Sequence, residues 1–505
     1  MVDKWWRGAV IYEVYVRSFA DGTGDGEGDL TGLRSRLPYL RELGIDAIWL
    51  TPFYPSPLAD GGYDVADYRD VDPRFGTLAD FDAMLADAHR LGLRVIVDIV
   101  PNHSSSAHPW FVEALASPPN SPARERYIFS DTTNDWQSMF GGSAWQRVPD
   151  GQYYLHLFDP GQPDFNWRNP EVRAEFESIL RFWLDRGVDG FRIDVAHGMI
   201  KAVGLPPLGD PPSSGVRTVL PYYDQDEVHD VYRDWRKILD SYPGDRIAVA
   251  EAWVTPPTRL ARYVVADELH QAFNFDFLEA PWSAPDLRRT IDSCLAAAEA
   301  VGAPTTWVLS NHDTHRHVTR YGSLARARAG TLLMLALPGS AYLYQGEELG
   351  LPEVLDLPDA ARQDPVFGRS GGADKGRAGC RVPIPWSGDT PPYGFSATGA
   401  AWLPSPASWG PLTVAAEEGE PGSTLSLYRE ALRLRRADSM TGPMTWHDSI
   451  PTVLDFERRG GLRCVVNAGD EPVPLPRGYG DPVLASGPLA GDRLPADTAA
   501  WFTRP

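Results

Sequence analysis

The sequence predicts an α/β fold: a (β/α)8 TIM barrel with a subdomain inserted after the third strand and a C-terminal β-sandwich domain. Short apolar runs alternate with amphipathic helical stretches over most of the chain, which is the pattern of parallel strands joined by crossover helices. Carboxylates follow several of these runs, and in a parallel barrel the ends of the strands converge on one face. An open doubly wound sheet shows the same alternation and stays the alternative on pattern alone.

Eight short apolar runs are expected to form the barrel strands. They cover residues 9–16, 47–50, 95–100, 191–193, 247–250, 273–275, 307–309 and 342–344. Between them lie helical patterns, of which the clearest is a series of leucines spaced by three and four. These are Leu33, Leu37, Leu40 and Leu43, and Gly44 follows as a stop signal.

The chain divides into four expected segments. Residues 1–102 and 169–410 form the two parts of the barrel. Residues 103–168 are rich in Pro, Gly, Trp and Tyr and too long for an ordinary connection, so they predict an inserted subdomain that overhangs the active face. A second long loop follows the eighth strand. Residues 411–505 begin with a helical stretch and continue as short alternating runs, which predict a small β-domain.

Composition limits the partners and the compartment. The 505 residues carry a formal charge of −21, which argues against nucleic acid or an anionic membrane as partner. No run reaches about 18 apolar residues, and the N-terminus lacks the pattern of a signal peptide. The three cysteines are odd in number and widely spaced, which fits neither a disulfide framework nor a zinc site. We therefore expect a cytoplasmic protein.

Four segments place acids or their partners at the ends of predicted strands. They are DIVPNH (98–103), GFRIDVAHG (190–198), VAEAW (249–253) and SNHDTHR (310–316). Three of their acids, Asp194, Glu251 and Asp313, would meet in one pocket of a closed barrel. Cleavage of a glycosidic bond with retention needs one ionised and one protonated carboxyl, about 5 to 5.5 Å apart. These acids are therefore sufficient for glycosidic bond chemistry.

With GYDVADY (62–68), QPDFNW (162–167) and QGEELG (345–350), the four segments resemble the α-amylase superfamily of glycoside hydrolases, family 13. The sequence is most similar to the α-glucosidase and oligo-1,6-glucosidase branch. The resemblance implies an exo-acting, retaining α-glucosidase that hydrolyses terminal α-glucosidic bonds of short oligosaccharides or aryl α-glucosides through a covalent glucosyl-enzyme. It implies no organic cofactor and a monomer or weak homo-oligomer.

Two other functions stay open. A transglucosylase or sugar isomerase of the same superfamily, trehalose synthase-like or sucrose-using, would form the same intermediate but exclude water. A non-catalytic member would have lost catalytic acids, whereas Asp194, Glu251 and Asp313 are all present.

The resemblance also implies a role for each acid. Asp194 is the nucleophile, and Arg192, two residues earlier on the same face of its strand, can hold it anionic. Glu251 is the general acid, because a buried strand end and the neighbouring Trp253 would raise its pKa. Asp313 is the third acid, whose charge stabilises the oxocarbenium-like transition state.

Sugar-binding residues follow from the same resemblance. Tyr63 is the expected stacking platform, and Asp60 with Arg381 is expected to hold the hydroxyls of the terminal glucose. Because that pair would close the pocket, only one sugar would fit beyond the scissile bond. The remaining expected binding residues are His103, Phe140, Phe158, Arg192 and His312. His197 is expected to pack rather than to bind.

A loop after the first strand predicts a metal site. Asp21, Thr23, Asp25, Glu27 and Asp29 alternate with glycines in DGTGDGEGDL. Hard cations such as Ca²⁺ or Mg²⁺ prefer several oxygens on such a loop, with Glu27 contributing its backbone carbonyl. Relatives in this branch carry such a structural site, and a solvated acidic turn is the alternative.

Departures from the resembled pattern, among them the VAHG sequence after Asp194, and the identity of Val195 concern specificity. Ala378 stands where relatives commonly show Asp, and Val382 where they often show Thr, which alters the support of Arg381. Val195, directly after the nucleophile, tends to accompany α-1,6 activity in this branch. Acceptor preference is also expected to depend on the Pro-rich stretch 205–221, which has no readable pattern.

Overall fold

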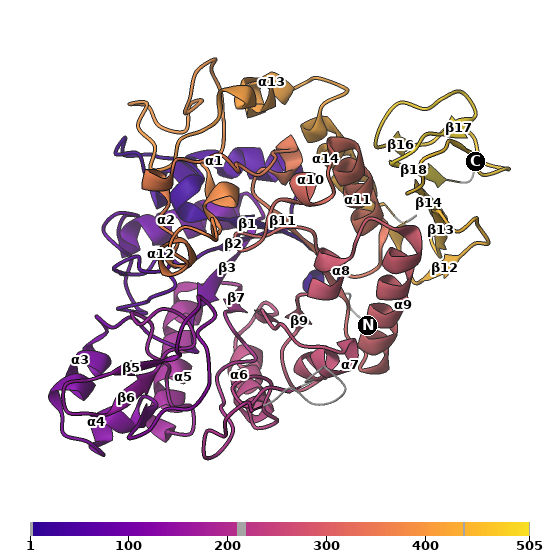
Figure 1. Cartoon of the computed structure of the whole chain (residues 1–505). Coiled ribbons are helices and arrows are strands. Elements are labelled where there is room, and N and C mark those ends of the chain that lie inside the picture. Colours follow the sequence, from indigo (N-terminus) through magenta and orange to yellow (C-terminus); the bar gives the residue numbers. More distant parts are fainter. Residues whose placement is uncertain (1–3, 210–218, 438–439, 504–505) are drawn as a thin grey trace.

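The computed structural model describes residues 4–209, 219–437 and 440–503. Eight parallel strands lie in the order β10-β11-β1-β2-β3-β7-β8-β9 (Figure 1). Their bounds are Val10–Val14 (β1), Ala47–Leu50 (β2), Arg94–Ile99 (β3), Gly190–Ile193 (β7), Ile247–Ala250 (β8), Gln271–Ala272 (β9), Thr306–Val308 (β10) and Ser340–Tyr344 (β11). A parallel bridge between Phe273 and Thr306 joins the two edges of the sheet. The predicted barrel is therefore confirmed, and the open sheet is not observed.

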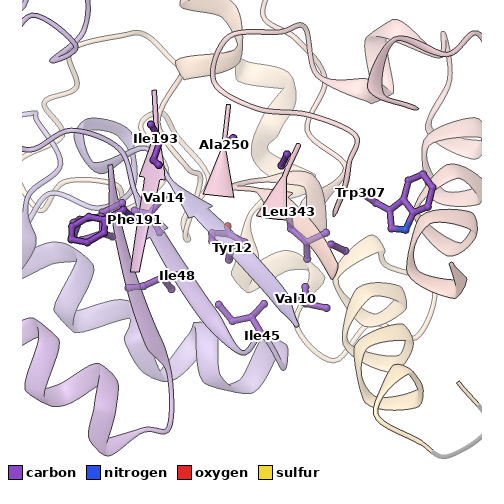
Figure 2. Close-up of a cluster of buried hydrophobic side chains, with 14 of the residues drawn as sticks. Val10, Tyr12, Val14, Ile45, Ile48, Phe191, Ile193, Ala250, Trp307 and Leu343 are labelled. Atoms are coloured by element: carbon purple, nitrogen blue, oxygen red, sulfur yellow. The ribbon is translucent and has the colours of Figure 1, made fainter. Parts of the chain in front are cut away.

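Side chains of the strands alternate between the barrel interior and the surrounding helices. Ile11 and Trp49 belong to an interior cluster, whereas Val10 and Tyr12 belong to the large cluster that also holds the apolar faces of the helices. Figure 2 shows Val10 and Tyr12 of β1 beside Leu343 of β11. This alternation follows from the two-residue period of a strand.

Helices cover the barrel from outside (Figure 1). They are α1 (Leu30–Leu43), α2 (Leu78–Arg90), α5 (Pro170–Arg186), α6 (Val228–Asp240), α7 (Pro257–Leu260), α8 (Phe275–Glu279), α9 (Ala284–Ala300), α10 (His317–Arg320) and α11 (Leu324–Ala336). Helix α1 begins at Asp29, whose side chain accepts the backbone N–H of Gly32, and ends at Gly44 with φ 98°. The predicted leucine helix and its stop are confirmed.

The sixth strand is shifted from its predicted place. Residues 273–275 were expected to be a strand, but β9 ends at Ala272 and Phe275 begins helix α8. The side chain of Asn274 accepts the backbone N–H of Phe277 and so starts this helix. Phe273 and Phe275 are buried in the barrel interior. The sequence of this segment is therefore as apolar as that of a buried strand.

The inserted subdomain contains α3 (Pro109–Ala116), α4 (Pro122–Glu125) and an antiparallel sheet in the order β4-β6-β5. Its strands are Phe129–Ser130 (β4), Trp145–Arg147 (β5) and Tyr153–Leu155 (β6). A buried ammonium joins it to the barrel. Lys201 Nζ contacts Asn102 Oδ1 at 2.7 Å, the Gly198 carbonyl at 2.6 Å and Asp164 Oδ2 at 2.6 Å.

After β11 a long loop carries short 3-10 turns and α12 (Pro365–Arg369). The turns are η4 (Glu347–Leu349), η5 (Asp359–Ala361), η6 (Ala378–Arg381) and η7 (Ala407–Leu412). Helices α13 (Val414–Glu417) and α14 (Thr424–Arg435) follow, and α14 packs against α1 and α11 of the barrel. The helical stretch expected at the start of the C-terminal segment thus lies on the barrel.

The C-terminal domain is a small β-sandwich beside α9 and α11 (Figure 1). One antiparallel sheet holds β12 (Met444–Trp446), β13 (Val453–Arg458), β14 (Leu462–Asn467), β18 (Thr498–Thr503) and β16 (Leu484–Ala485); the other holds β15 (Val473–Pro474) and β17 (Arg493–Leu494). Val473 and Leu494 share a core with Val465 and Phe502 of the first sheet.

Within the described ranges, no helix is both long and apolar enough to cross a membrane.

Candidate active site

A cavity of about 440 Å³ lies where the carboxyl ends of the barrel strands converge. Its volume is in the range of small-molecule binding sites. The cavity is lined by Asp60, Tyr63, His103, Met139, Phe158, Asp194, Val195, His197, Tyr223, Glu251, Trp253, Asp313 and Arg377. The structure therefore brings the three predicted acids together in one place.

Arg192 lies between three carboxylates beneath the cavity. Its Nη1 donates to Asp194 Oδ1 at 2.6 Å and to Asp98 Oδ1 at 3.1 Å, and its Nη2 lies 3.6 Å from Glu251 Oε2. The Arg192 side chain is buried, so its charge acts with little screening by water. One guanidinium therefore offsets much of the repulsion among Asp98, Asp194 and Glu251.

The protonation of Asp194 and Glu251 follows from this geometry. Burial raises the pKa of both carboxyls, and Arg192 opposes that rise in both. Because Arg192 lies closer to Asp194 than to Glu251, it favours the anion on Asp194. A proton held by the pair is then best placed on Glu251, as a nucleophile and a general acid require.

Glu251 is held by two N–H donors. Its Oε2 accepts the backbone N–H of Val195 at 2.6 Å, and its Oε1 accepts the indole N–H of Trp253 at 2.8 Å. Val195 has φ 42°, which a β-branched residue adopts only under strain. The strained backbone thus aims an amide from the residue after Asp194 at Glu251.

Asp313 is surrounded by positive charge. Its Oδ1 accepts from Arg377 Nη1 at 2.9 Å and Arg381 Nη2 at 2.8 Å, and its Oδ2 lies 3.2 Å from His312 Nε2. Although burial opposes ionisation, His312 and the arginines, including Arg192, lower the pKa of Asp313 well below its usual range. Asp313 is therefore an anion at the pH where enzymes work.

The predicted pairing of Asp60 with Arg381 needs correction. Asp60 Oδ1 accepts from Arg377 Nη2 at 2.5 Å, and its Oδ2 accepts from Gln162 Nε2 at 3.1 Å. Arg381 does not line the cavity; its Nε donates to the His312 carbonyl at 2.9 Å. The arginine that lines the cavity and pairs with Asp60 is thus Arg377, four residues earlier in the loop after β11.

Of the other predicted binding residues, some line the cavity and others support the lining residues from behind. Tyr63, His103 and Phe158 line the cavity, and burial lowers the pKa of His103 to about 4, so its ring is neutral. His312 stacks behind Tyr63 with ring centroids 5.2 Å apart. Phe140 also lies behind the wall, with its ring 5.1 Å below the Arg377 guanidinium.

Four further lining residues were not assigned from the sequence. They are Met139, Tyr223, Trp253 and His197, and His197 was expected only to pack. His197 follows Asp194 by three residues, a spacing that could have indicated its place. Met139 and Tyr223 lie in loops without periodicity, so no comparable signal marked them.

The predicted metal loop folds into a tight turn. Asp21 accepts backbone N–H groups of Thr23 at 3.0 Å and Gly26 at 2.8 Å, and the Glu27 carboxylate pairs with Arg17 at 2.7 Å. Within the described part of the chain, no three His, Cys, Asp or Glu side chains converge on a metal-binding point. The fit is partial, because the side chains bond to amides and the turn still offers carbonyl and hydroxyl oxygens. The ion stays a prediction.

Comparison with known proteins settles the family. Residues 13–442 match the family described as "Alpha amylase, catalytic domain", and residues 452–501 match a domain of unknown function, DUF3459. This chain belongs to the α-amylase family. The first match includes the inserted subdomain and helix α14 and ends before β12, in agreement with the packing of α14 on the barrel.

Within the α-amylase family, the sequence is 40% identical to a probable alpha-glucosidase of Rhizobium meliloti (strain 1021) over 92% of this chain and 90% of the relative. It is 37% identical to an oligo-1,6-glucosidase of Parageobacillus thermoglucosidasius over 86% of this chain and 84% of that protein. An alpha-glucosyl transfer enzyme of known structure superposes with a TM-score of 0.92 at 37% identity, each chain covered completely. The protein is therefore a glycoside hydrolase of the α-amylase family.

Proposed function

We propose that the protein is an exo-acting, retaining α-glucosidase for short oligosaccharides. The observation that carries this proposal is the ion pair between Asp60 and Arg377 in the lining of the cavity that holds the three acids. We infer that this pair closes one end of the cavity. A closed end leaves room for a single terminal sugar and excludes the middle of a long chain. Endo-acting cleavage would need a cleft open at both ends.

The terminal glucose would lie between Tyr63 and the polar wall of Asp60, Arg377 and His103. Asp60 can accept hydrogen bonds from sugar hydroxyls, and the neutral His103 ring lies beside it; both contact Gln162, which fixes them. Tyr63 offers an apolar face, and His312 stacked behind it holds that face in place.

Bond cleavage then uses the remaining residues. The Asp194 carboxylate attacks the anomeric carbon while Glu251 gives its proton to the leaving oxygen, and a glucosyl ester forms on Asp194. The anionic Asp313 stabilises the positive charge that develops on the sugar ring. In the second half, Glu251 takes a proton from water, and the hydroxide attacks the same carbon so that the anomeric configuration is retained.

Transfer to another hydroxyl is the second candidate function. Two structural relatives favour it: the alpha-glucosyl transfer enzyme and the trehalulose synthase of Pseudomonas mesoacidophila MX-45, which superposes with a TM-score of 0.90 at 33% identity over the whole of both chains. Both reactions would share the ester on Asp194 and differ only in what attacks it.

The test is a panel of maltose, isomaltose, sucrose, trehalose and an aryl α-glucoside, with products and their anomeric configuration followed by NMR. We expect glucose released first as the α-anomer, and a loss of several orders of magnitude in kcat for Asp194→Ala. Glu251→Gln should spare α-glucosyl fluoride, whose leaving group needs little protonation. Release of β-glucose, or a folded Asp194→Ala variant with near-normal activity, would contradict the proposal.

A further inference from the structure

A second cavity, of about 670 Å³, lies at the opposite end of the barrel from the catalytic cavity. Arg7, Thr305 and Gly339 in its lining precede β1, β10 and β11, so this cavity faces the amino ends of the strands. Met444 of β12 and Arg458 of β13 line it from the other side. The cavity therefore lies between the barrel and the C-terminal domain, and it shares no lining residue with the catalytic cavity.

Three arginines in this lining are fixed by backbone carbonyls at the ends of helices. Arg458 donates to the carbonyl of Ala336, the last residue of α11, at 2.8 Å, and Arg435 donates to carbonyls of the same helix end. Arg7 donates to the Gly302 carbonyl, just beyond α9, at 3.0 Å. A guanidinium has five N–H donors, and none of the three arginines makes more than three hydrogen bonds. Each arginine is thus held in place and still has donors for a ligand.

The charge of this cavity is positive in a protein whose formal charge is −21. Among the described residues, the three guanidiniums donate to carbonyls and form no ion pair with a carboxylate. Glu299 also lines the cavity but pairs with none of them. Burial lowers the pKa of Arg458 to about 9 and that of Arg435 to about 10, and the charge of Arg435 adds to the shift of Arg458. Both therefore stay charged at neutral pH and repel each other.

This arrangement suits a phosphate group. An anion between like charges offsets their repulsion, and the planar fork of arginine matches the paired oxygens of phosphate. A phosphate ester carries close to two negative charges and three acceptor oxygens, whereas a carboxylate carries one charge and two oxygens. Three arginines against one glutamate therefore match a phosphate better than a carboxylate.

The cavity also has room and apolar surface for more than a phosphate. Its volume lies in the range of sites that hold whole organic ligands. Leu295, Leu337 and Met444 supply apolar lining, and Leu295 and Met444 are only partly buried, so part of their surface can still be covered. An organic group attached to the phosphate would remove this surface from water.

We propose that the cavity between the barrel and the C-terminal domain is a binding site for a small organic phosphate. The phosphate group lies among Arg7, Arg435 and Arg458, and the organic group lies against Leu295 and Met444. Because the lining residues differ from those of the catalytic cavity, the ligand does not compete with the sugar substrate. The site also does not depend on the proposed glucosidase activity.

The first experiment is isothermal titration calorimetry of the whole protein with phenyl phosphate and with inorganic phosphate as probes. We expect saturable binding of phenyl phosphate, with a Kd about tenfold or more below that of inorganic phosphate, because apolar contacts add to the contacts with the arginines. Raising the NaCl concentration to about 0.3 M should weaken the binding of both probes. Equal Kd values for the two probes, or no saturable binding of phenyl phosphate up to about 10 mM, would overturn the inference.

A substitution at Gly8 tests the location without removing any arginine. Gly8 lines the cavity, its φ of −124° suits any residue, and a Cβ built there meets no atom within 4 Å. Gly8→Glu would place a carboxylate beside the arginines and should raise the Kd of phenyl phosphate about tenfold or more. Gly8→Gln has the same size without the charge and should keep the Kd within about twofold of wild type. Equal Kd values for the two variants would overturn the assignment of the site.

A second pair of variants tests the arginines themselves. Arg435→Gln removes one charge from the cavity and should also raise the Kd of phenyl phosphate about tenfold, as expected for a lost charge-assisted contact. Arg433→Gln is the matched control, because Arg433 lies on the same helix, is outside the cavity lining and has a side chain that is 66% exposed. It should leave the Kd unchanged. A folded Arg435→Gln variant that binds like Arg433→Gln would contradict the site, and the Gly8 variants decide the question if Arg435→Gln does not fold.

Discussion

Arg192 shows how one side chain sets the chemistry of its neighbours. A buried cluster of Asp98, Asp194 and Glu251 would be unstable without a cation, because like charges at short range in a low dielectric repel strongly. Arg192 contacts the first two and lies slightly farther from the third. The same asymmetry also distinguishes Asp194, the proposed nucleophile, from Glu251, the proposed general acid.

At the neighbouring position, Val195 is expected to influence which linkage is cleaved. Its side chain lines the cavity next to Asp194, and a β-branched apolar group shapes the leaving-group side by exclusion. We predict that isomaltose is cleaved at a rate comparable with maltose. Val195→Thr should shift the ratio of kcat/KM toward maltose by about 3- to 10-fold, since a difference of this size is worth about 1 to 3 kcal/mol at most.

The measurement is kcat/KM for both disaccharides in wild type and variant. Thr is also β-branched and should tolerate φ 42° about as well as Val, so the comparison isolates the hydroxyl. Inert isomaltose in the wild type would remove the basis of this prediction. Attention would then turn to the Pro-rich stretch 205–221, of which residues 210–218 lie outside the described residues.

Arg377 illustrates why part of the site could not be predicted. The acids follow buried strands and Arg192 lies within β7, so the barrel fixes their positions and the sequence pattern could indicate them. Arg377 and Arg381 lie in a loop without periodicity, one turn apart, and both contact Asp313. Only the loop path decides which of the two reaches Asp60, and no local pattern encodes that path.

At the scale of elements, two predictions differ from the structure, and in both cases packing with distant residues outweighed the local sequence pattern. The run at Phe273 and Phe275 looked like a strand because both side chains are buried, yet Asn274 caps a helix there. Helix α14 was grouped with the C-terminal segment because it follows a loop, yet its apolar face packs on α1 and α11. Long-range packing decided both cases.

The metal loop after β1 gives a prediction about stability. An ion bound by this loop would act by preferring the folded state, because the loop does not line the catalytic cavity. On protein shown to contain Ca²⁺ or Mg²⁺, EDTA should lower the melting temperature more than it lowers activity measured below that temperature. An unchanged melting temperature after the metal has been removed would contradict the site.

Lys201 gives a second prediction at this scale, because it ties the inserted subdomain to the barrel. Lys201→Met would leave Asp164 buried without its cation, and breaking a buried pair costs about 3 to 5 kcal/mol. We expect a clearly lower melting temperature by calorimetry. Lys4→Met is the matched control, since Lys4 pairs with Asp245 on the surface and such pairs contribute about 0 to 1 kcal/mol. Equal effects of the two variants would argue against the role of Lys201.

For the whole molecule, the closed barrel builds the two sides of the cavity from opposite arcs of strands. Loops after β2, β3, β10 and β11 supply the polar side, which we propose binds the sugar, and loops after β7 and β8 supply the other. The fold explains why distant segments of the sequence meet, and the strand order explains which of them face each other. Strand order follows from right-handed crossovers and was predictable, whereas the loop conformations above the barrel were not.

Burial of several neutral histidines gives a prediction for the stability of the whole protein. Burial lowers the pKa of His103 and His108 to about 4 and that of His270 and His317 to about 3, from a usual value of 6.5. Below pH 6.5 the unfolded chain therefore binds more protons than the folded one, so stability is lost as the pH falls from about 6.5 toward 4. At pH 4.5, His270 alone would account for about 2 to 3 kcal/mol of this loss.

We expect the melting temperature to fall steadily between pH 6.5 and 4.5 when followed by calorimetry. In the wild type the Ala248 N–H donates to His270 Nδ1 at 3.3 Å. In His270→Asn the amide oxygen can still accept this hydrogen bond, while the titrating ring is removed. The fall with pH should then be smaller than in the wild type. If the melting temperatures of His270→Asn and the wild type fall by the same amount over this range, burial of His270 is not a source of the acid sensitivity. Protonation of carboxylates in ion pairs, such as Asp313, would then have to account for it.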